Sequence, residues 1–74
     1  MRIGVIGAGS WGTALSLTLA ANGHEVTLWG HDPLHMARIQ AQRCNTRYLP
    51  EIHFPANLLS TGDLGLAVLN QELI

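Results

Sequence analysis

Apolar residues fall into short blocks separated by turn-forming residues, and this pattern predicts the elements of the chain. Residues 2–6 form a short, mostly apolar and β-prone run, typical of a strand buried on both faces. Residues 13–21 are rich in Leu and Ala and long enough for a helix, which Asn22 and Gly23 end. Residues 25–29 carry the β-branched and aromatic residues that strands favour. The pattern therefore predicts a strand–helix–strand unit with a right-handed crossover.

A second helix is predicted after the second strand. Asp32 is suited to its N-cap and Pro33 to its first helical position. We expect one modest buried face, made of Leu34, Met36, Ala37, Ile39 and Ala41. Residues 44–57 are typical of a loop. Beyond them we expect a weak strand at 58–61 and a short helix at 63–70, with Thr61 or Gly62 near its cap.

Between the first strand and the first helix lies the glycine pattern Gly7-x-Gly9-x-x-Gly12. In this strand–turn–helix context it becomes a dinucleotide-binding fingerprint. We expect Gly7 to permit a turn where a Cβ would clash, Gly9 to let the backbone approach a pyrophosphate, and Gly12 to let the helix pack closely on the sheet. The free N–H groups and the positive end of the helix would face the phosphates. The alternative is a glycine-rich turn that binds nothing.

The last three residues, Glu72, Leu73 and Ile74, resemble the opening of another strand that is cut off before it can pair. In a doubly wound sheet that strand would lie beside the first, so residues 2–6 are expected to form an exposed sheet edge. The predicted fold class is α/β, a partial, truncated Rossmann-type doubly wound parallel sheet. Residues 1–74 are expected to be the N-terminal part of a dinucleotide-binding domain, with the substrate domain absent.

Cofactor selectivity depends on the tip of the second strand. NAD-selective sites usually carry an acidic residue there, to bind the ribose 2′-hydroxyl. Here Trp29 is followed by Gly30 and His31, and Glu25 lies at the opposite end of the strand. Asp32 could reach toward the ribose, but its helix-cap role explains it. Because no acidic residue at the tip repels a 2′-phosphate and His31 adds a neutral or cationic donor, we expect NADP(H) to be accepted, either in preference to NAD(H) or beside it.

Composition limits the remaining possibilities. The chain has 74 residues, enough for one small domain, and is 47% hydrophobic and 12% charged, which is typical of a globular protein. A net charge of −1 with four scattered arginines predicts no nucleic-acid partner, and the apolar stretch at 13–21 is too short for membrane insertion. The single cysteine, Cys44, fits a reducing compartment, and the four histidines lack metal-ligand spacing. We therefore expect a cytoplasmic protein without a metal site.

Longer motifs extend the glycine pattern into a family resemblance. GAGSWGTAL at 7–15, NGHEV at 22–26 and LWGHDP at 28–33, followed by NTRYLP at 45–50 and FPANL at 54–58, resemble bacterial NAD(P)-dependent glycerol-3-phosphate dehydrogenase. The resemblance implies reversible hydride transfer between dihydroxyacetone phosphate and sn-glycerol 3-phosphate, which supplies the phospholipid backbone. It also implies NADPH contacts by Ser10, Trp11 and His31.

Some of the family's features are missing here. The chain contains no lysine, whereas the family uses lysines further along to bind the substrate. No catalytic residue is therefore assigned, His35 and His53 are expected to be surface and loop residues, and glycerol 3-phosphate is expected to bind only with the missing C-terminal part. Arg47 and Tyr48 lie in a loop that either covers the cofactor or packs. The alternatives are a free-standing dinucleotide-binding or sensing module, and a fragment of another Rossmann dehydrogenase such as a 3-hydroxyacyl-CoA dehydrogenase.

Overall fold

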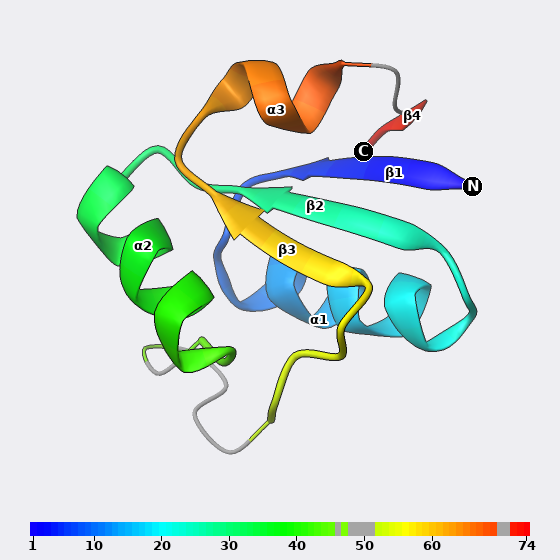
Figure 1. The fold of residues 1–74 in the computed structure, drawn as a ribbon, viewed down its shortest axis with the longest axis horizontal. Helices are drawn as coiled ribbons and strands as arrows, with labels where there is room; N and C mark the ends of the chain where they lie inside the picture. The colour runs from blue at the N-terminus through cyan, green and yellow to red at the C-terminus, as the bar shows by residue number, and fades with distance from the viewer. Residues whose placement is uncertain (46, 48–51, 70–71) are drawn as a thin grey trace.

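The computed structural model describes residues 1–45, 47, 52–69 and 72–74. The elements follow in the order β1 (Arg2–Ile6), α1 (Ser10–Ala21), β2 (Glu25–Trp29), α2 (Pro33–Gln42), β3 (Leu58–Thr61), α3 (Leu64–Val68) and β4 (Glu72–Leu73) (Figure 1). The strands form one sheet in the order β3-β2-β1-β4, and every pair is parallel. The predicted α/β class and doubly wound parallel sheet are confirmed.

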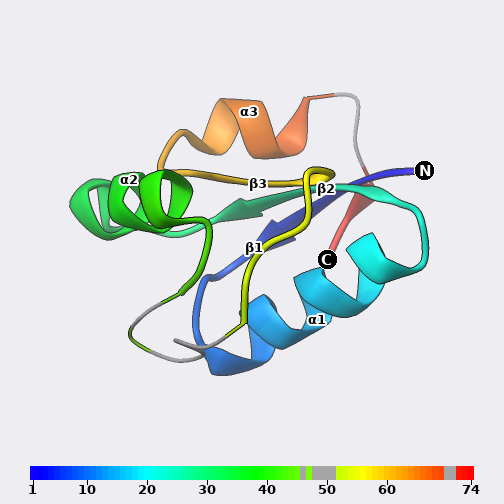
Figure 2. The ribbon, with the colours of Figure 1, turned by 60° about the horizontal axis from the view of Figure 1, so that its bottom comes forward.

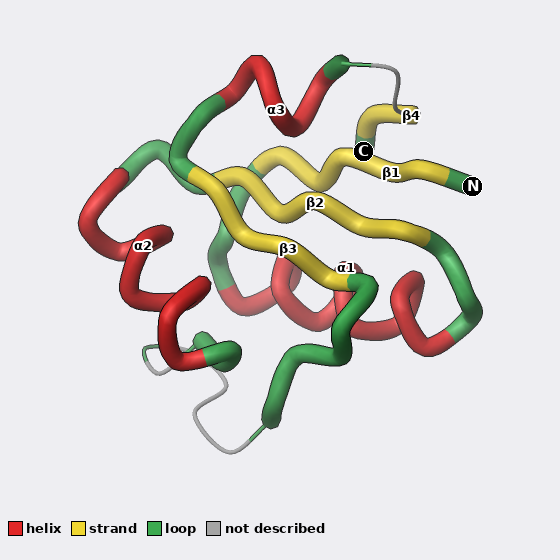
Figure 3. Tube along the Cα trace, in the orientation of Figure 1, coloured by secondary structure: helices red, strands yellow, loops and turns green. Residues whose placement is uncertain are grey.

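Helices lie on both faces of the sheet. Figure 2 shows α3 and α1 on opposite sides of it. Alternate residues of the strands point toward α1 and α2 and form the core with them: Ile3, Val5, Ala20, Val26, Leu28, Met36, Ile39, Phe54 and Leu58. The carboxyl ends of β1 and β2 lie at the same edge of the sheet, where loops lead into α1 and α2 (Figure 3). This edge is where ligands bind in open parallel sheets.

The strand β4 corrects the expectation about the sheet edge. Its two residues pair in parallel with Ile3 and Gly4 of β1. The N–H of Ile74 donates to the Gly4 carbonyl at 2.9 Å, and the N–H of Ile6 donates to the Ile74 carbonyl at 2.9 Å. A Cβ on Gly4 would lie 1.9 Å from the Ala67 carbonyl oxygen, so α3 packs its backbone directly on β1. Because α3 packs so closely on β1, the residues after it can pair with β1 as β4. The prediction that the chain ends before its last strand can pair is therefore wrong.

The buried face of α2 also differs from the prediction. His35, Met36 and Ile39 are buried. Three residues predicted to be buried are exposed, namely Leu34, Ala37 and Ala41. The surface position predicted for His35 is wrong as well. On a ten-residue helix with few apolar side chains, two different stripes fit helical spacing, and only packing on β3 selects one of them.

The helix α3 begins one residue later and ends earlier than predicted. Its N-cap is Asp63, whose carboxylate accepts the Gly65 N–H at 2.9 Å, rather than Thr61 or Gly62. Asn70, at the end of the predicted helix, lies outside the described residues. A short polar side chain that accepts a first-turn amide is the usual way to satisfy a helix start.

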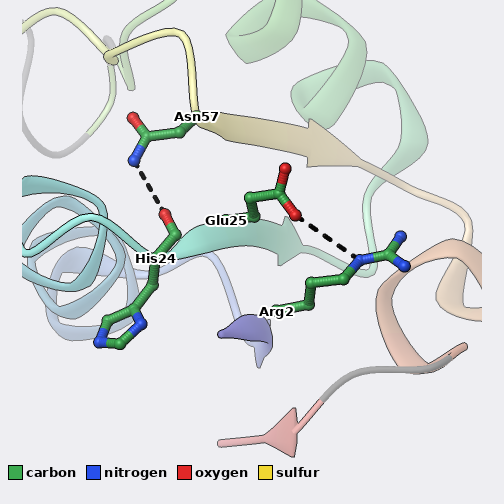
Figure 4. Close-up of polar contacts among 4 residues, drawn as sticks. All are labelled: Arg2, His24, Glu25 and Asn57. Atoms are coloured by element: carbon green, nitrogen blue, oxygen red, sulfur yellow. Dashed lines mark hydrogen bonds and ion pairs between the residues drawn. The ribbon is translucent and has the colours of Figure 1, made fainter.

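Polar contacts join the elements at the amino ends of the strands (Figure 4). Arg2 and Glu25 form an exposed ion pair at 3.8 Å, which contributes little to stability. The amide of Asn57 donates at 2.8 Å to the carbonyl oxygens of both Ala20 and His24. These bonds fix the approach to β3 against the turn between α1 and β2. Glu25, the first residue of β2, thus lies at the amino-end edge of the sheet, away from the carboxyl ends of the strands, as predicted.

Candidate functional site

A cleft of about 250 Å³ lies at the carboxyl ends of β1 and β2. The glycine turn, the tip of β2, the start of α2 and one later arginine line it: Gly7, Ala8, Gly9, Gly30, His31, Asp32, His35 and Arg47. The fold therefore brings together the two features that the sequence singles out, the glycine turn and the strand tip. Crevices at this edge are the usual ligand sites of doubly wound sheets.

Gly7 starts the turn in a backbone conformation that side chains disfavour. Its φ is +117°, and its N–H donates to the Trp29 carbonyl at 2.8 Å, which fixes the turn to the end of β2. A Cβ on Gly7 would meet nothing within 4 Å. The expected clash is therefore the wrong reason for this glycine. The positive φ is the physical requirement.

Gly12 is required because the Gly7 carbonyl approaches its Cα closely. A Cβ there would lie 1.9 Å from the Gly7 carbonyl oxygen and 3.8 Å from the Val5 side chain. At Gly12 the closest approach is therefore to the turn that precedes the helix, and the contact with the sheet is an ordinary one rather than the tight one predicted. At Gly9 a Cβ would meet nothing within 4 Å, so the space in front of the helix start is open to a ligand.

The helix α1 begins at Ser10, three residues earlier than predicted. Its first internal bond runs from the Thr13 N–H to the Gly9 carbonyl at 3.0 Å. The preceding amides of Ser10, Trp11 and Gly12 therefore have no acceptor within the helix. The first turn carries no acidic side chain, and Trp11 is 73% exposed. Such a helix start favours an anion.

At the tip of β2, the residues that follow the strand take separate roles. His31 is exposed and lines the cleft. Asp32 caps α2, because one carboxylate oxygen accepts the N–H groups of Leu34 at 3.1 Å and His35 at 3.2 Å. The His35 bond is the main cause that holds the pKa of Asp32 below its usual value, and partial desolvation opposes it. The predicted cap is confirmed.

Sequence reasoning missed Asn45. This side chain is fully buried, and its amide donates to the Ala8 carbonyl at 3.1 Å and to the Thr13 hydroxyl at 2.9 Å. Asn45 is far along the chain from the glycine turn, so no local periodicity could reveal the contact. Arg47 reaches the same cleft. Tyr48, its neighbour, lies outside the described residues.

Metal-ligand clusters and membrane-spanning helices are absent from the part of the chain that the structure describes. No group of three His, Cys, Asp or Glu residues there gathers to hold a metal ion. Among the same residues, no helix is long and apolar enough to cross a membrane. Cys44 is a free, buried thiol.

The family assignment follows from the whole chain. Residues 2–74 match the family described as NAD-dependent glycerol-3-phosphate dehydrogenase N-terminus. The chain belongs to this family. The resemblance predicted from the motifs is thus confirmed, and a fragment of a different dehydrogenase family is excluded. The cofactor class predicted for the chain, NAD(H) or NADP(H), is the class of this family of oxidoreductases.

Individual relatives agree with the family. Glycerol-3-phosphate dehydrogenase (NAD(P)+) from Cronobacter sakazakii is 59% identical over 64 residues, which is 86% of this chain and 19% of that protein. The Escherichia coli protein of the same name is 58% identical over the same lengths. The crystal structure of glycerol-3-phosphate dehydrogenase from Coxiella burnetii superposes with a TM-score of 0.91 at 43% identity, covering 95% of this chain and 22% of that one. The chain spans about a fifth of the length of these relatives.

Proposed function

We propose that residues 1–74 form the N-terminal part of the dinucleotide-binding domain of an NAD(P)-dependent glycerol-3-phosphate dehydrogenase. The observation that carries the proposal is the cleft, where the glycine turn that leads into α1 meets the tip of β2. Family membership and the names of the relatives support it. The whole protein would interconvert sn-glycerol 3-phosphate and dihydroxyacetone phosphate for phospholipid synthesis.

In this proposal the glycine turn binds the pyrophosphate. Gly7 holds the turn in shape, and Gly9 leaves space for the phosphates. The amides of Ser10, Trp11 and Gly12 donate hydrogen bonds to them, since these groups have no acceptor in the helix. The exposed indole of Trp11 lies next to this contact and would report it by its fluorescence.

His31 is assigned to the ribose. It is exposed at the tip of β2, where dinucleotide sites bind the adenosine ribose. An imidazole there can donate a hydrogen bond to a hydroxyl or to a 2′-phosphate. We therefore expect both NADH and NADPH to bind.

The chemistry itself is assigned to the rest of the protein. The residues here would bind and orient a nicotinamide cofactor, which when bound would supply or accept the hydride, and they have no catalytic role. About four-fifths of each relative lies outside the match, and the substrate-binding and catalytic residues are expected there. A cytoplasmic location is also proposed, since it fits the single unpaired thiol of Cys44.

Calorimetric titration of the protein with NADPH and NADH tests the proposal, with the quenching of tryptophan fluorescence as a second readout. Gly9→Val fills the open space before α1. It is expected to weaken the binding of both cofactors more than tenfold, which corresponds to at least about 1.4 kcal/mol of binding free energy. Ala14→Val places the same side chain on an exposed position of the same helix and serves as the control.

The far-UV circular dichroism of both variants should match that of the unmodified protein. Binding that Gly9→Val leaves unchanged would contradict the assignment of the turn. A folded protein that binds neither cofactor would overturn the proposed function.

A further inference from the structure

Asn45 ties the segment that follows α2 to the glycine turn. Its amide donates to the Ala8 carbonyl at 3.1 Å and to the Thr13 hydroxyl at 2.9 Å, and its side chain is fully buried. Ala8 belongs to the turn and Thr13 to the first part of α1. One side chain therefore holds the later segment against both parts of the phosphate-facing backbone.

The partners of Asn45 fix the orientation of its amide. The Ala8 carbonyl only accepts, and the Thr13 hydroxyl points toward the same carbonyl at 3.4 Å, so the amide must present its NH₂ group to both. The other end, Oδ1, is buried and has no hydrogen-bond partner among the described residues. Arg47 follows this inward anchor by two residues.

Arg47 lines the cleft beside Asp32. Its side chain is exposed, and within the described ranges it makes no ion pair or hydrogen bond. After the backbone N–H groups of His35 and Leu34, its positive charge also lowers the pKa of Asp32, as expected of a guanidinium near that carboxylate. Arg47 thus offsets the negative charge that would repel a phosphate from the ribose end of the cleft.

We propose that Arg47 binds the 2′-phosphate of NADP(H) and is, with His31, the residue that lets this site accept the phosphorylated cofactor. A guanidinium presents paired N–H groups that match the geometry of a phosphate. The inference rests on the proposed dinucleotide site and adds a specificity residue to it. Sequence alone does not separate this role from packing, because the position of Arg47 depends on the Asn45 anchor.

Arg47→Gln tests the inference, with Arg38→Gln as the matched control. Arg38 is exposed on α2 and does not line the cleft, so its replacement removes the same charge elsewhere. Dissociation constants for NADPH, NADH, 2′,5′-ADP and 5′-AMP are measured by calorimetry at one fixed salt concentration. Arg47→Gln is expected to raise the dissociation constants of NADPH and 2′,5′-ADP about tenfold. Those of NADH and 5′-AMP should change less than about twofold. Arg38→Gln should leave all four nearly unchanged.

The outcomes separate this inference from the proposed function. Equal weakening of NADPH and NADH would overturn the 2′-phosphate contact and assign Arg47 to a group that both cofactors share. An unchanged affinity for NADPH would also overturn it, while the proposed function would stand because the dinucleotides still bind. If the unmodified, folded protein binds no dinucleotide, the proposed function fails and the inference fails with it.

Discussion

The guanidinium of Arg43 donates a hydrogen bond to the Leu58 carbonyl at 2.6 Å, and so joins the end of α2 to the first residue of β3. The same group donates to the Pro55 carbonyl at 2.7 Å and to the Gln40 side chain at 3.0 Å. Gln40 in turn accepts the Ser60 N–H at 2.9 Å. One arginine thus aligns the edge strand with the helix that packs on it.

Replacing Arg43 should therefore destabilise the fold. Arg43→Ala leaves two carbonyl oxygens without this donor, and we expect about 2 kcal/mol less free energy of unfolding in urea titrations. Arg43 also has a φ of +56°, so Arg43→Gly should lose less stability than Arg43→Ala. Arg38→Ala, on the exposed face of α2, should stay within about 0.5 kcal/mol. Equal losses for Arg38→Ala and Arg43→Ala would contradict this role.

Gly12→Ala is expected to displace the glycine turn. Its Cβ would meet the Gly7 carbonyl at 1.9 Å, and backbone cannot move aside as a flexible side chain can. We expect a loss of about 3 kcal/mol in the free energy of unfolding, measured by thermal denaturation. Gly9→Ala has open space and an ordinary φ of −73°, and should change stability by less than about 1 kcal/mol. A Gly12→Ala protein as stable as Gly9→Ala would disprove the close approach.

Asn45→Asp should lower the free energy of unfolding more than Asn45→Ala. The aspartate replaces a buried donor with a carboxylate that faces the Ala8 carbonyl and the Thr13 hydroxyl, whereas alanine only removes the bonds. We expect about 2 kcal/mol of lost stability for alanine and more for aspartate at neutral pH. Since protonation removes the buried charge, the aspartate variant should approach the alanine variant in acid. Denaturant titrations at both pH values would show whether the order holds.

Asp32 should make stability depend on pH in acid. The His35 N–H, followed by the Leu34 N–H and the charge of Arg47, holds the pKa of this carboxylate below its usual 3.8. Because the folded-state pKa is lowered, the stabilisation is complete above the unfolded value and is lost as pH falls through the folded one. Asp32→Asn keeps an oxygen to cap α2 but has no charge. Its melting temperature should lie below that of the unmodified protein at pH 7, and the difference should vanish in strong acid. A constant difference across this range would contradict the prediction.

The features that depend on neighbours in sequence were predictable. Asp32 and Pro33 predict the start of α2, because they suit its N-cap and first helical position. Gly23 has a φ of 90°, the positive value expected after a helix. The glycine pattern located the turn and its helix within a few residues. These are local properties, since a cap or a left-handed residue constrains the backbone around itself.

Features that depend on distant partners were decided by the tertiary structure. Two stripes of α2 fit helical spacing, and packing on β3 buries the one that contains His35. The pairing of β4 depends on α3 lying directly on Gly4. Asn45 reaches the glycine turn, and Arg47 reaches the cleft, only because the chain after α2 folds back onto that turn. The sequence by itself determined the fold class, the family and the glycine turn, because each is encoded within a short window. Tertiary structure alone decided which later residues complete the site, because hydrogen bonds across more than thirty residues leave no periodic signal in the chain.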